Sequence, residues 1–329
     1  MSIAGKAGLV SVIVPSYNYA QYIKKRMDSL IKQTYRDIEI LVIDDCSSDN
    51  SVQVLREYES HPRVRLVICE QNGGWAAVNN QGVEISSGEF ILFAQCDDDC
   101  DPHMIERLVD AMRINPTAGI AFCRSLLVGE DNQMLGDDFA GRETSFRTRC
   151  AKDTLISGSE MSRFLLHSCV IPNLSAMLIR RGCFSSVGNF TSSYRVCGDW
   201  EWFFKIASRY DVAYIAEPLN RFRQHDNTIR SLTKARVVYE EYFRLLLGQI
   251  RRLELTFFES CHYRTHVMYL WGIHLLSQPW VGLRNFPYHL RRISQLDARA
   301  LLFFFPALIA CIFTGLGKIY NKLHCLTSL

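Results

Sequence analysis

Short apolar segments alternate with amphipathic ones through the first 125 residues of this 329-residue chain. The apolar segments are rich in β-branched side chains, as in Val-Ser-Val-Ile-Val at residues 10–14 and Ile-Glu-Ile-Leu-Val-Ile at residues 38–43. Between them, residues 22–33 repeat apolar side chains at helical spacing. Short apolar runs closed by polar turns are typical of strands buried on both faces. Alternation of this kind predicts a parallel sheet flanked by helices.

The same patterns predict the remaining elements. We expect strands at residues 10–14, 38–43, 64–68, 90–94, 119–123, 174–179 and 212–216, and helices at residues 22–33, 51–58, 75–85, 104–114 and from residue 199 onward. Residues 126–160 hold few periodic apolar positions and are expected to form a long excursion or loop. Beyond about residue 230 the sequence is helical, aromatic and basic. We therefore expect two domains, residues 1–228 and residues 229–329.

Polar clusters follow two of the expected strands. Asp44 and Asp45 close the strand at residues 38–43, and residues 97–99, all aspartates, follow the strand at residues 90–94. In open parallel sheets, ligands bind beyond the carboxyl ends of the strands. The two clusters are therefore expected to share one crevice.

The acidic cluster at Asp97, Asp98, Asp99 and Asp101 is the sharpest chemical feature. Like charges this close repel one another, so the cluster needs a cation or exposure to water. Carboxylate oxygens suit Mg²⁺ or Mn²⁺, which also bind substrate phosphates. A solvated acidic turn is the plainer alternative. A calcium loop is excluded, because its required glycine and glutamate would fall at Pro102 and Leu108.

Two further features point towards a nucleotide. The Asp45 carboxylate could accept hydrogen bonds from a base or a ribose, whereas Asp49 is better explained as a helix cap. The turn Asn72-Gly73-Gly74 allows a close backbone approach. The chain contains neither G-x-G-x-x-G after its first strand nor G-x-x-x-x-G-K-[ST], which argues against dinucleotide enzymes and P-loop NTPases.

A second acidic segment opens the helix at residue 199. Trp200 and Trp202 would partly desolvate Asp199 and raise its pKa, which suits a general base. Asp199 as a helix cap, with Trp202 in the core, is the alternative, and both can hold at once. Arg223 and His225 would point the same way in an extended segment, towards an anion or a metal. From their spacing alone, a structural pair is nearly as good an explanation.

Charge is distributed unevenly along the chain. The net charge of +3 gives no indication of nucleic-acid binding. Residues 1–225 hold 24 Lys and Arg and 28 Asp and Glu. Of the totals of 37 and 34, residues 226–329 hold the remaining 13 Lys and Arg and 6 Asp and Glu. The balances are therefore −4 and +7. An acidic front and a basic tail indicate two different tasks.

The tail also carries the one candidate membrane segment. Residues 300–317 hold no charge, but Pro306 interrupts the run. Three alternatives stay open: an interfacial or re-entrant segment, a packing helix, and a full span. No signal peptide is expected from residues 1–8, and the 12 cysteines without a C-x-x-C pair predict free thiols in a reducing cytoplasm.

In combination and order, these motifs resemble glycosyltransferase family 2 across residues 9–225. The segments that carry the resemblance are Val10-Ser-Val-Ile-Val-Pro15-Ser-Tyr17-Asn18, Gln33-Thr34-Tyr35, Ile43-Asp44-Asp45-Cys-Ser47-Ser-Asp49, Asn72-Gly73-Gly74, Asn80, Gly88-Glu89, Asp97-Asp98, Gly198-Asp199-Trp200 and Phe222-Arg223-Gln224-His225. The resemblance implies a GT-A-type fold: a Rossmann-like, mostly parallel sheet flanked by helices, here with a C-terminal helical extension. It makes residues 1–228 the catalytic domain.

The resemblance also implies an activity: inverting transfer of a sugar from a nucleoside-diphosphate donor, more readily a UDP- or dTDP-sugar. The donor-binding residues that it implies are Pro15, Tyr17, Asn18, Asp45, Asn72, Gly73, Asp98 and Arg223. Asp97 and His225 would bind Mg²⁺ or Mn²⁺, and Asp199 would be the catalytic base. The expected acceptor is a glycan or lipid-linked oligosaccharide of the cell envelope, reached from the cytoplasm at an anionic membrane surface.

Two positions depart from the family pattern. Gln95 stands where the metal motif usually begins with an aspartate, and Asn79 stands where an arginine often precedes Asn80. A catalytically silent sugar-nucleotide-binding protein is therefore an alternative. A sugar nucleotidyltransferase is a weaker one, because Pro15-Ser16-Tyr17-Asn18-Tyr19 replaces its glycine- and lysine-rich loop.

Overall fold

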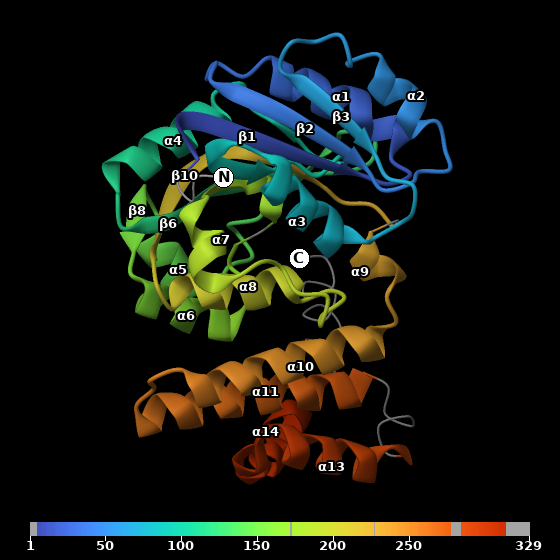
Figure 1. Cartoon of the computed structure of the whole chain (residues 1–329). Coiled ribbons are helices and arrows are strands. Elements are labelled where there is room, and N and C mark those ends of the chain that lie inside the picture. The colour runs from blue at the N-terminus through green and yellow to red at the C-terminus, as the bar shows by residue number, and fades with distance from the viewer. Residues whose placement is uncertain (1–4, 172, 227, 278–283, 314–329) are drawn as a thin grey trace. The chain divides into compact units, whose positions relative to one another are not determined.

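A computed structural model describes residues 5–171, 173–226, 228–277 and 284–313 (Figure 1). These residues form two compact units. The sheet unit comprises the chain up to Ser162, Val170–Ser193 and Gly198–His225. The helical unit comprises Arg163–Cys169, Tyr194–Cys197 and the chain from Asp226 onward. Two short segments before residue 228 thus belong to the helical unit, which a single division of the sequence did not predict.

The sheet unit alternates strands and helices. In chain order its elements are β1 (Lys6–Ser16), α1 (Ala20–Ile31), β2 (Ile38–Asp44), α2 (Ser51–Arg56), β3 (Val64–Ile68), α3 (Trp75–Ile85), β4 (Gly88–Phe93), β5 (Asp99–Cys100), α4 (Met104–Ile114), β6 (Ala118–Val128), β7 (Met134–Asp137), α5 (Thr144–Arg149), β8 (Thr154–Ile156), the start of α6 (Gly158–His167), the 3₁₀ turn η1 (Leu174–Ala176), β9 (Met177–Arg180), α7 (Gly182–Val187), α8 (Gly198–Ala207) and β10 (Asp211–Arg223).

The strands form one mixed sheet in the order β3-β2-β1-β4-β9-β6-β10-β5, with β7 beside β6 and β8 beside β10. The half from β3 to β4 is parallel, as are β6 and β10. Strand β9 is antiparallel to both β4 and β6, so the two parallel parts are joined through it. The α/β class with flanking helices is confirmed. The antiparallel β9 was not predicted.

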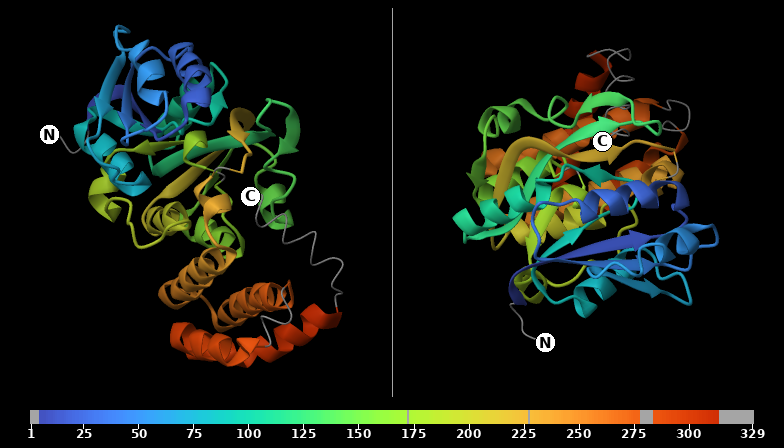
Figure 2. Two further views of the ribbon diagram at one scale, coloured as in Figure 1. Left: turned by 90° about the vertical axis from the view of Figure 1, so that its right-hand side faces the viewer. Right: turned by 90° about the horizontal axis from the view of Figure 1, so that it is seen from above.

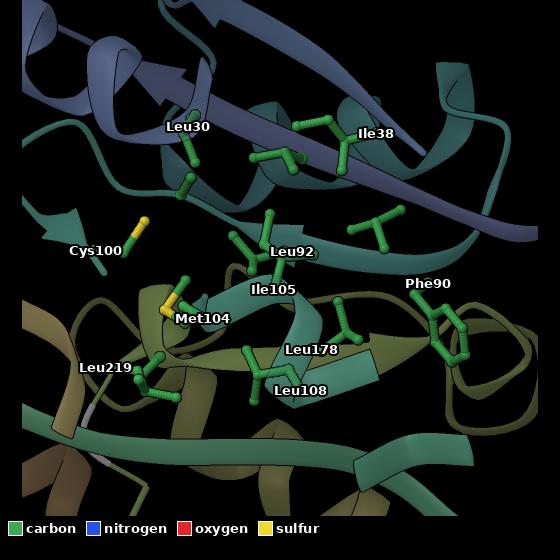
Figure 3. Close-up of a cluster of buried hydrophobic side chains, with 14 of the residues drawn as sticks. Leu30, Ile38, Phe90, Leu92, Cys100, Met104, Ile105, Leu108, Leu178 and Leu219 are labelled. Carbon is green, nitrogen blue, oxygen red and sulfur yellow. The ribbon is translucent and has the colours of Figure 1, made fainter. Parts of the chain in front are cut away.

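Strand β1 is buried on both faces because helices cover both sides of the sheet (Figures 1 and 2). Side chains alternate along a strand, so Val12 and Val14 join the core cluster under α1 and α4, while Ile13 faces α3. Figure 3 shows other members of this cluster, among them Leu30 of α1 and Leu108 of α4. A Cβ on Gly82 of α3 would lie 2.5 Å from Ile13, so glycine lets this helix approach the sheet closely. Burial of each large apolar side chain stabilises the fold by about 1.5–3 kcal/mol.

Residues 126–160 are structured, contrary to the expectation of a long loop. Strand β6 runs on to Val128 and turns back into β7, and β8 adds a short edge beside β10. A buried ion pair between Arg142 and Asp138, 3.2 Å long and only 4% exposed on each side, replaces the missing apolar pattern. The Asp138 carboxylate also accepts the Ser125 N–H at 3.0 Å. Polar contacts therefore help to order this segment, together with isolated buried side chains such as Phe146 and Ile156, and hydrophobic periodicity reports neither.

The helical unit contains the end of α6, α9 (Ile229–Leu232), α10 (Ala235–Arg252), α11 (Phe257–Ser277), α13 (Phe286–Asp297), the 3₁₀ turn η2 (Ala298–Ala300) and α14 (Leu301–Phe313). Helix α11 packs against both α10 and α14. Phe243 and Trp271 stack between α10 and α11, with ring centroids 4.3 Å apart. Of the expected uncharged stretch, residues 314–317 lie outside the described residues.

Candidate active site

Strands β2 and β4 flank β1 and run parallel to it, so their carboxyl ends lie at one edge of the sheet. The register pairs Pro15 with Ile43, which places the end of β1 beside the end of β2. Tyr17 follows β1 and is 47% exposed. This is the arrangement expected for the crevice.

Asn18 ties β1 to the loop after β2. It adopts a positive φ of 57°, its N–H donates to the Ser47 hydroxyl at 2.9 Å, and its side-chain oxygen accepts the Ser48 N–H at 2.8 Å. Asp49 accepts the N–H groups of Ser51 and Ala20, at 2.9 and 3.2 Å. Asp49 therefore has the capping role that was favoured for it.

Asp45 organises the glycine turn. Its two carboxylate oxygens accept the N–H groups of Gly73 and Gly74, at 2.7 and 2.9 Å, and its carbonyl oxygen accepts the Asn72 amide at 3.2 Å. Gly74 has a φ of +80°, a conformation that favours glycine. The structure thus brings together Asp45, Asn72 and Gly73, three of the predicted donor-binding residues.

The three consecutive aspartates have different environments. The Asp97 side chain is 15% exposed and that of Asp99 only 3%, and Asp98 is 2% exposed as a residue. Asp98 accepts the Arg223 N–H at 2.9 Å, and burial together with the charge of Asp97 raises the pKa of Asp98 to about 7. Only Asp97 presents a carboxylate that a ligand from solvent could reach directly.

Asp99 belongs to an internal ion-pair network. Lys25 and Arg221 lie 2.7 and 2.8 Å from its two carboxylate oxygens. Burial acts to raise the pKa of Asp99, but these two cations outweigh it and hold that pKa below its ordinary value. Asp99 is therefore an ionised structural anchor.

His225 lies directly against Asp97. Its Nε2 is 3.1 Å from the Asp97 carboxylate, and its buried ring packs against the rings of Tyr19 and Tyr22 at centroid distances of 5.8 and 5.5 Å. Burial and the charge of Asp97 raise the pKa of Tyr19, so this phenol stays neutral. The two residues predicted to bind the metal are thus neighbours.

Arg223 has a different environment from the one predicted. Its guanidinium makes five hydrogen bonds, to the carbonyl oxygens of residues 97, 129 and 130, to Asp99 and to Asn132. Arg223 is 2% exposed, and its cation lies 5.3 Å from the Tyr22 ring centroid. A guanidinium offers five N–H groups as hydrogen-bond donors. Groups of the protein accept from all five, so none is left for the predicted contact with the nucleotide sugar.

Asn132 completes this arrangement at the tip of the β6–β7 hairpin. Its side-chain oxygen accepts from Arg223 at 2.8 Å and from Lys25 at 2.5 Å. We call Arg223, Lys25 and Asn132 the arginine clamp, because they hold the hairpin tip and α1 against residues 97–99. The sequence analysis did not identify Lys25 or Asn132, whose only signal was a polar residue within a turn or on the outer face of a helix.

Asp199 lies in the first turn of α8, half-buried beside the buried Trp200. Trp202 is fully buried and stacks on Phe184, as the core alternative held. The start of α8 packs on Trp75, since a Cβ on Gly198 would lie 2.5 Å from that indole ring. Trp75 is the first residue of α3 and directly follows Gly74. The start of α8 therefore packs on the first residue of the helix that follows the glycine turn held by Asp45.

Asp97 and His225 could serve as a partial metal site. Among the residues that the structure describes, no group of three His, Cys, Asp or Glu side chains is arranged to hold a metal ion. Magnesium is ordinarily bound by one or two carboxylates, with water and substrate phosphates completing its coordination. A carboxylate and an imidazole at the sheet edge fit a cation that arrives with a diphosphate.

Comparison with known proteins was made for both sequence and structure. The model of glycosyl transferase family 2 matches residues 11–183. An uncharacterized glycosyltransferase of Rickettsia typhi is 28% identical over 250 residues, which cover 74% of this chain and 72% of that protein. The teichuronic acid biosynthesis glycosyltransferase TuaG of Bacillus subtilis is 30% identical over 45% of this chain and 59% of its own length. Matches to uncharacterized glycosyltransferases of Nostoc and Escherichia coli span 38% and 33% of those proteins.

Solved structures share the fold. Staphylococcus aureus TarS in complex with UDP-GlcNAc superimposes with a TM-score of 0.65 at 19% identity, over 90% of this chain and 83% of that one. The mannosyltransferase PcManGT of Pyrobaculum calidifontis, in complex with GDP-Man and Mn²⁺, gives a TM-score of 0.55 at 16% identity over 93% and 87%. At these identities the likeness concerns the fold alone.

Proposed function

Since the chain belongs to glycosyltransferase family 2, we propose that it is an inverting, metal-dependent transferase that moves a sugar from a nucleoside-diphosphate donor to a hydroxyl acceptor. One observation carries the proposal. Asp45 and Asp97 follow β2 and β4, whose carboxyl ends lie at one edge of the sheet; Asp97 pairs there with His225, Asp45 holds the glycine turn, and the helix that begins with Gly198 and Asp199 packs on Trp75 after that turn. Each step of a sugar transfer has a candidate residue there.

The nucleoside would bind between the end of β1 and the glycine turn. Pro15, Tyr17 and Asn18 at the end of β1 would line one side of this region, and Asp45 with Asn72 and Gly73 would line the other. Asp45 would accept a hydrogen bond from the base with the carboxylate lone pairs that the two glycine N–H groups leave free. TarS was solved with UDP-GlcNAc and PcManGT with GDP-Man on the same fold, which supports a nucleoside-diphosphate sugar as the donor; a UDP- or dTDP-sugar stays the preferred class from the family resemblance.

Asp97 and His225 would hold Mg²⁺ or Mn²⁺ against the diphosphate. When bound, such a cation neutralises negative charge on the leaving group. Asp98 is buried behind Asp97 and would support the loop. We assign Arg223 a positioning role within the arginine clamp, in place of the predicted contact with the donor.

Asp199 would accept the proton of the attacking hydroxyl. One base and no protein nucleophile give a single displacement, which inverts the anomeric carbon. NMR of the product should therefore show the anomeric configuration opposite to that of the donor. A retained configuration would contradict the single-displacement mechanism.

Substitution of the base provides a second test. We expect Asp199→Asn to lower turnover by roughly 10²- to 10⁴-fold, with donor binding almost unchanged. Glu201→Gln on the same helix is the matched control, because Glu201 is already paired with Lys205 at 2.9 Å. Full activity in Asp199→Asn together with a loss in Glu201→Gln would move the base to Glu201.

The acceptor is proposed from the relatives. TuaG is named for teichuronic acid biosynthesis, and a hyaluronan synthase of Pasteurella multocida is 25% identical over 76% of this chain and 24% of its own length. These names support a glycan or lipid-linked acceptor of an envelope polysaccharide. Within the described residues all eleven cysteines are free thiols, which supports a cytoplasmic location.

A further inference from the structure

One side of α14 exposes four large apolar side chains. Leu302, Phe305, Ile309 and Ile312 are 75, 52, 54 and 57% exposed. Their spacing of three, four and three residues places them in one row along the helix. We call this row the α14 face. Ile114, by contrast, is a large exposed apolar residue that stands alone on α4, and single residues of this kind are ordinary on soluble proteins.

The opposite side of α14 is fully packed. Phe304, Ala307 and Cys311 are at most 3% exposed, and the Cys311 thiol donates to the Tyr269 carbonyl oxygen of α11 at 3.3 Å. A Cβ on Gly272 of α11 would lie 3.0 Å from the same sulfur. The helix is therefore fixed to α11 along one side, and its apolar face points away from that contact.

This anchoring argues against a membrane span. By length and composition alone, the 27-residue helical run Phe286–Ile312 could cross a membrane. The backbone is extended at Asp297, however, where the run divides into α13 and α14. Asp297 also forms a buried ion pair of 2.7 Å with Arg264 of α11.

Arginines lie in the sequence just before the α14 face. Residues 284–313 contain four arginines, and their one acidic residue, Asp297, is already paired with Arg264. Arg284, Arg291 and Arg299 are exposed. Basic side chains beside an apolar helix face complement anionic headgroups above acyl chains. An apolar patch on a second protein would gain nothing from these three charges.

We propose that the α14 face is a docking surface for an anionic lipid bilayer, with α14 lying in the headgroup region and the exposed arginines on the lipid phosphates. Leu302 and Phe305 would enter the apolar layer together with Ile309 and Ile312. The contact is independent of the chemistry at Asp97, so it goes beyond the proposed transfer reaction. It would bring a soluble catalytic unit to a lipid-linked acceptor.

Vesicle co-sedimentation of the full-length chain tests this proposal. We expect the wild type to bind vesicles of phosphatidylcholine with phosphatidylglycerol and to bind pure phosphatidylcholine much less. The double variant Leu302→Glu and Ile309→Glu should lose at least about tenfold in partitioning, because two apolar side chains no longer enter the bilayer. The matched control, Ser294→Glu with Gln295→Glu, changes the net charge equally at two exposed positions but removes no apolar surface.

Circular dichroism would establish that both variants fold. Greater vesicle binding by the control than by the α14 variant supports the proposal. Equal binding by the two variants, or no binding of the wild type to anionic vesicles, would overturn it. So would a wild-type dimer in light scattering that becomes a monomer in the α14 variant while neither binds vesicles, since the α14 face would then be a contact between two copies of the chain.

Discussion

Single residues of one type have very different tasks at the sheet edge. Three consecutive aspartates differ because their neighbours differ: Asp97 meets His225, Asp98 accepts a backbone N–H, and Asp99 pairs with Lys25 and Arg221. The sequence predicted a carboxylate cluster and its place after β4. It could not predict which carboxylate is accessible, because the partners lie 74 to 128 residues away along the chain.

Arg223 and Arg221 allow a direct test of the arginine clamp. Both approach the Asp99 carboxylate, but their side chains are 2% and 41% exposed. Removal of the buried cation leaves buried acceptors unpaired, so Arg223→Met should lower the free energy of unfolding by about 3–5 kcal/mol. Arg221→Met should cost about 1 kcal/mol or less. Urea denaturation measures both.

One outcome would contradict the structural role of Arg223. If Arg223→Met unfolds at the same urea concentration as Arg221→Met but loses donor affinity, Arg223 contacts the donor as the family resemblance implied. The clamp would then be secondary to binding.

At the scale of elements, hydrophobic periodicity predicted the bounds correctly where one strand or helix buries a continuous row of apolar side chains. Residues 64–68, 75–85 and 104–114 form β3, α3 and α4 at the predicted bounds. The direction of strand β9 could not be predicted from the sequence, because the same apolar run is compatible with parallel and with antiparallel pairing. The predicted strand at residues 174–179 begins instead with the turn η1, where the Asn173 side chain accepts the Ala176 N–H at 3.0 Å.

The start of α8 provides a test of how Asp199 is positioned. Gly198→Ala places a methyl group 2.5 Å from Trp75, so the helix or the indole must move. We expect a loss of about 1–3 kcal/mol in stability and a fall in turnover. Gly182→Ala, at the first residue of α7, meets nothing within 4 Å and should leave both unchanged or slightly improved. Equal effects of the two substitutions would remove the packing argument for Asp199.

The helical unit should carry an acid-sensitive element. His274 packs against Tyr239, with ring centroids 4.0 Å apart, and burial together with His289 lowers the pKa of His274 to about 4. Arg236, Glu240 and Arg292 line the same pocket. Because the unfolded chain takes up this proton near pH 6.5 and the folded chain does not, stability should fall as pH decreases from about 6.5 to 4, by up to roughly 3 kcal/mol.

Denaturation at several pH values checks this dependence. His274→Phe should flatten the curve over that range, while His262→Gln, at an exposed position of α11, should not. An unchanged slope in His274→Phe would mean that other groups, His289 first among them, are responsible.

At the scale of the whole chain, we propose that the two charge balances correspond to different tasks. The acidic residues 1–225 contain every candidate residue for the chemistry, and the basic residues 226–329 contain the α14 face. The two compact units do not follow a single division of the sequence, because residues 163–169 and 194–197 belong to the helical unit. There the Glu241 carboxylate accepts the N–H groups of residues 195–197, at 2.7, 2.8 and 3.2 Å.

The central claim is that the chain cleaves a nucleoside-diphosphate sugar at the edge formed by Asp97, His225 and Asp199. Release of nucleoside diphosphate from a panel of UDP-, dTDP- and GDP-sugars, with Mn²⁺ or Mg²⁺ and after chelation, tests it most directly. We expect nucleoside diphosphate to be released from one class of donor. This release should require the cation and should fall at least about a hundredfold in Asp97→Asn. Donor binding without release under any of these conditions would contradict the claim and leave a silent sugar-nucleotide-binding protein.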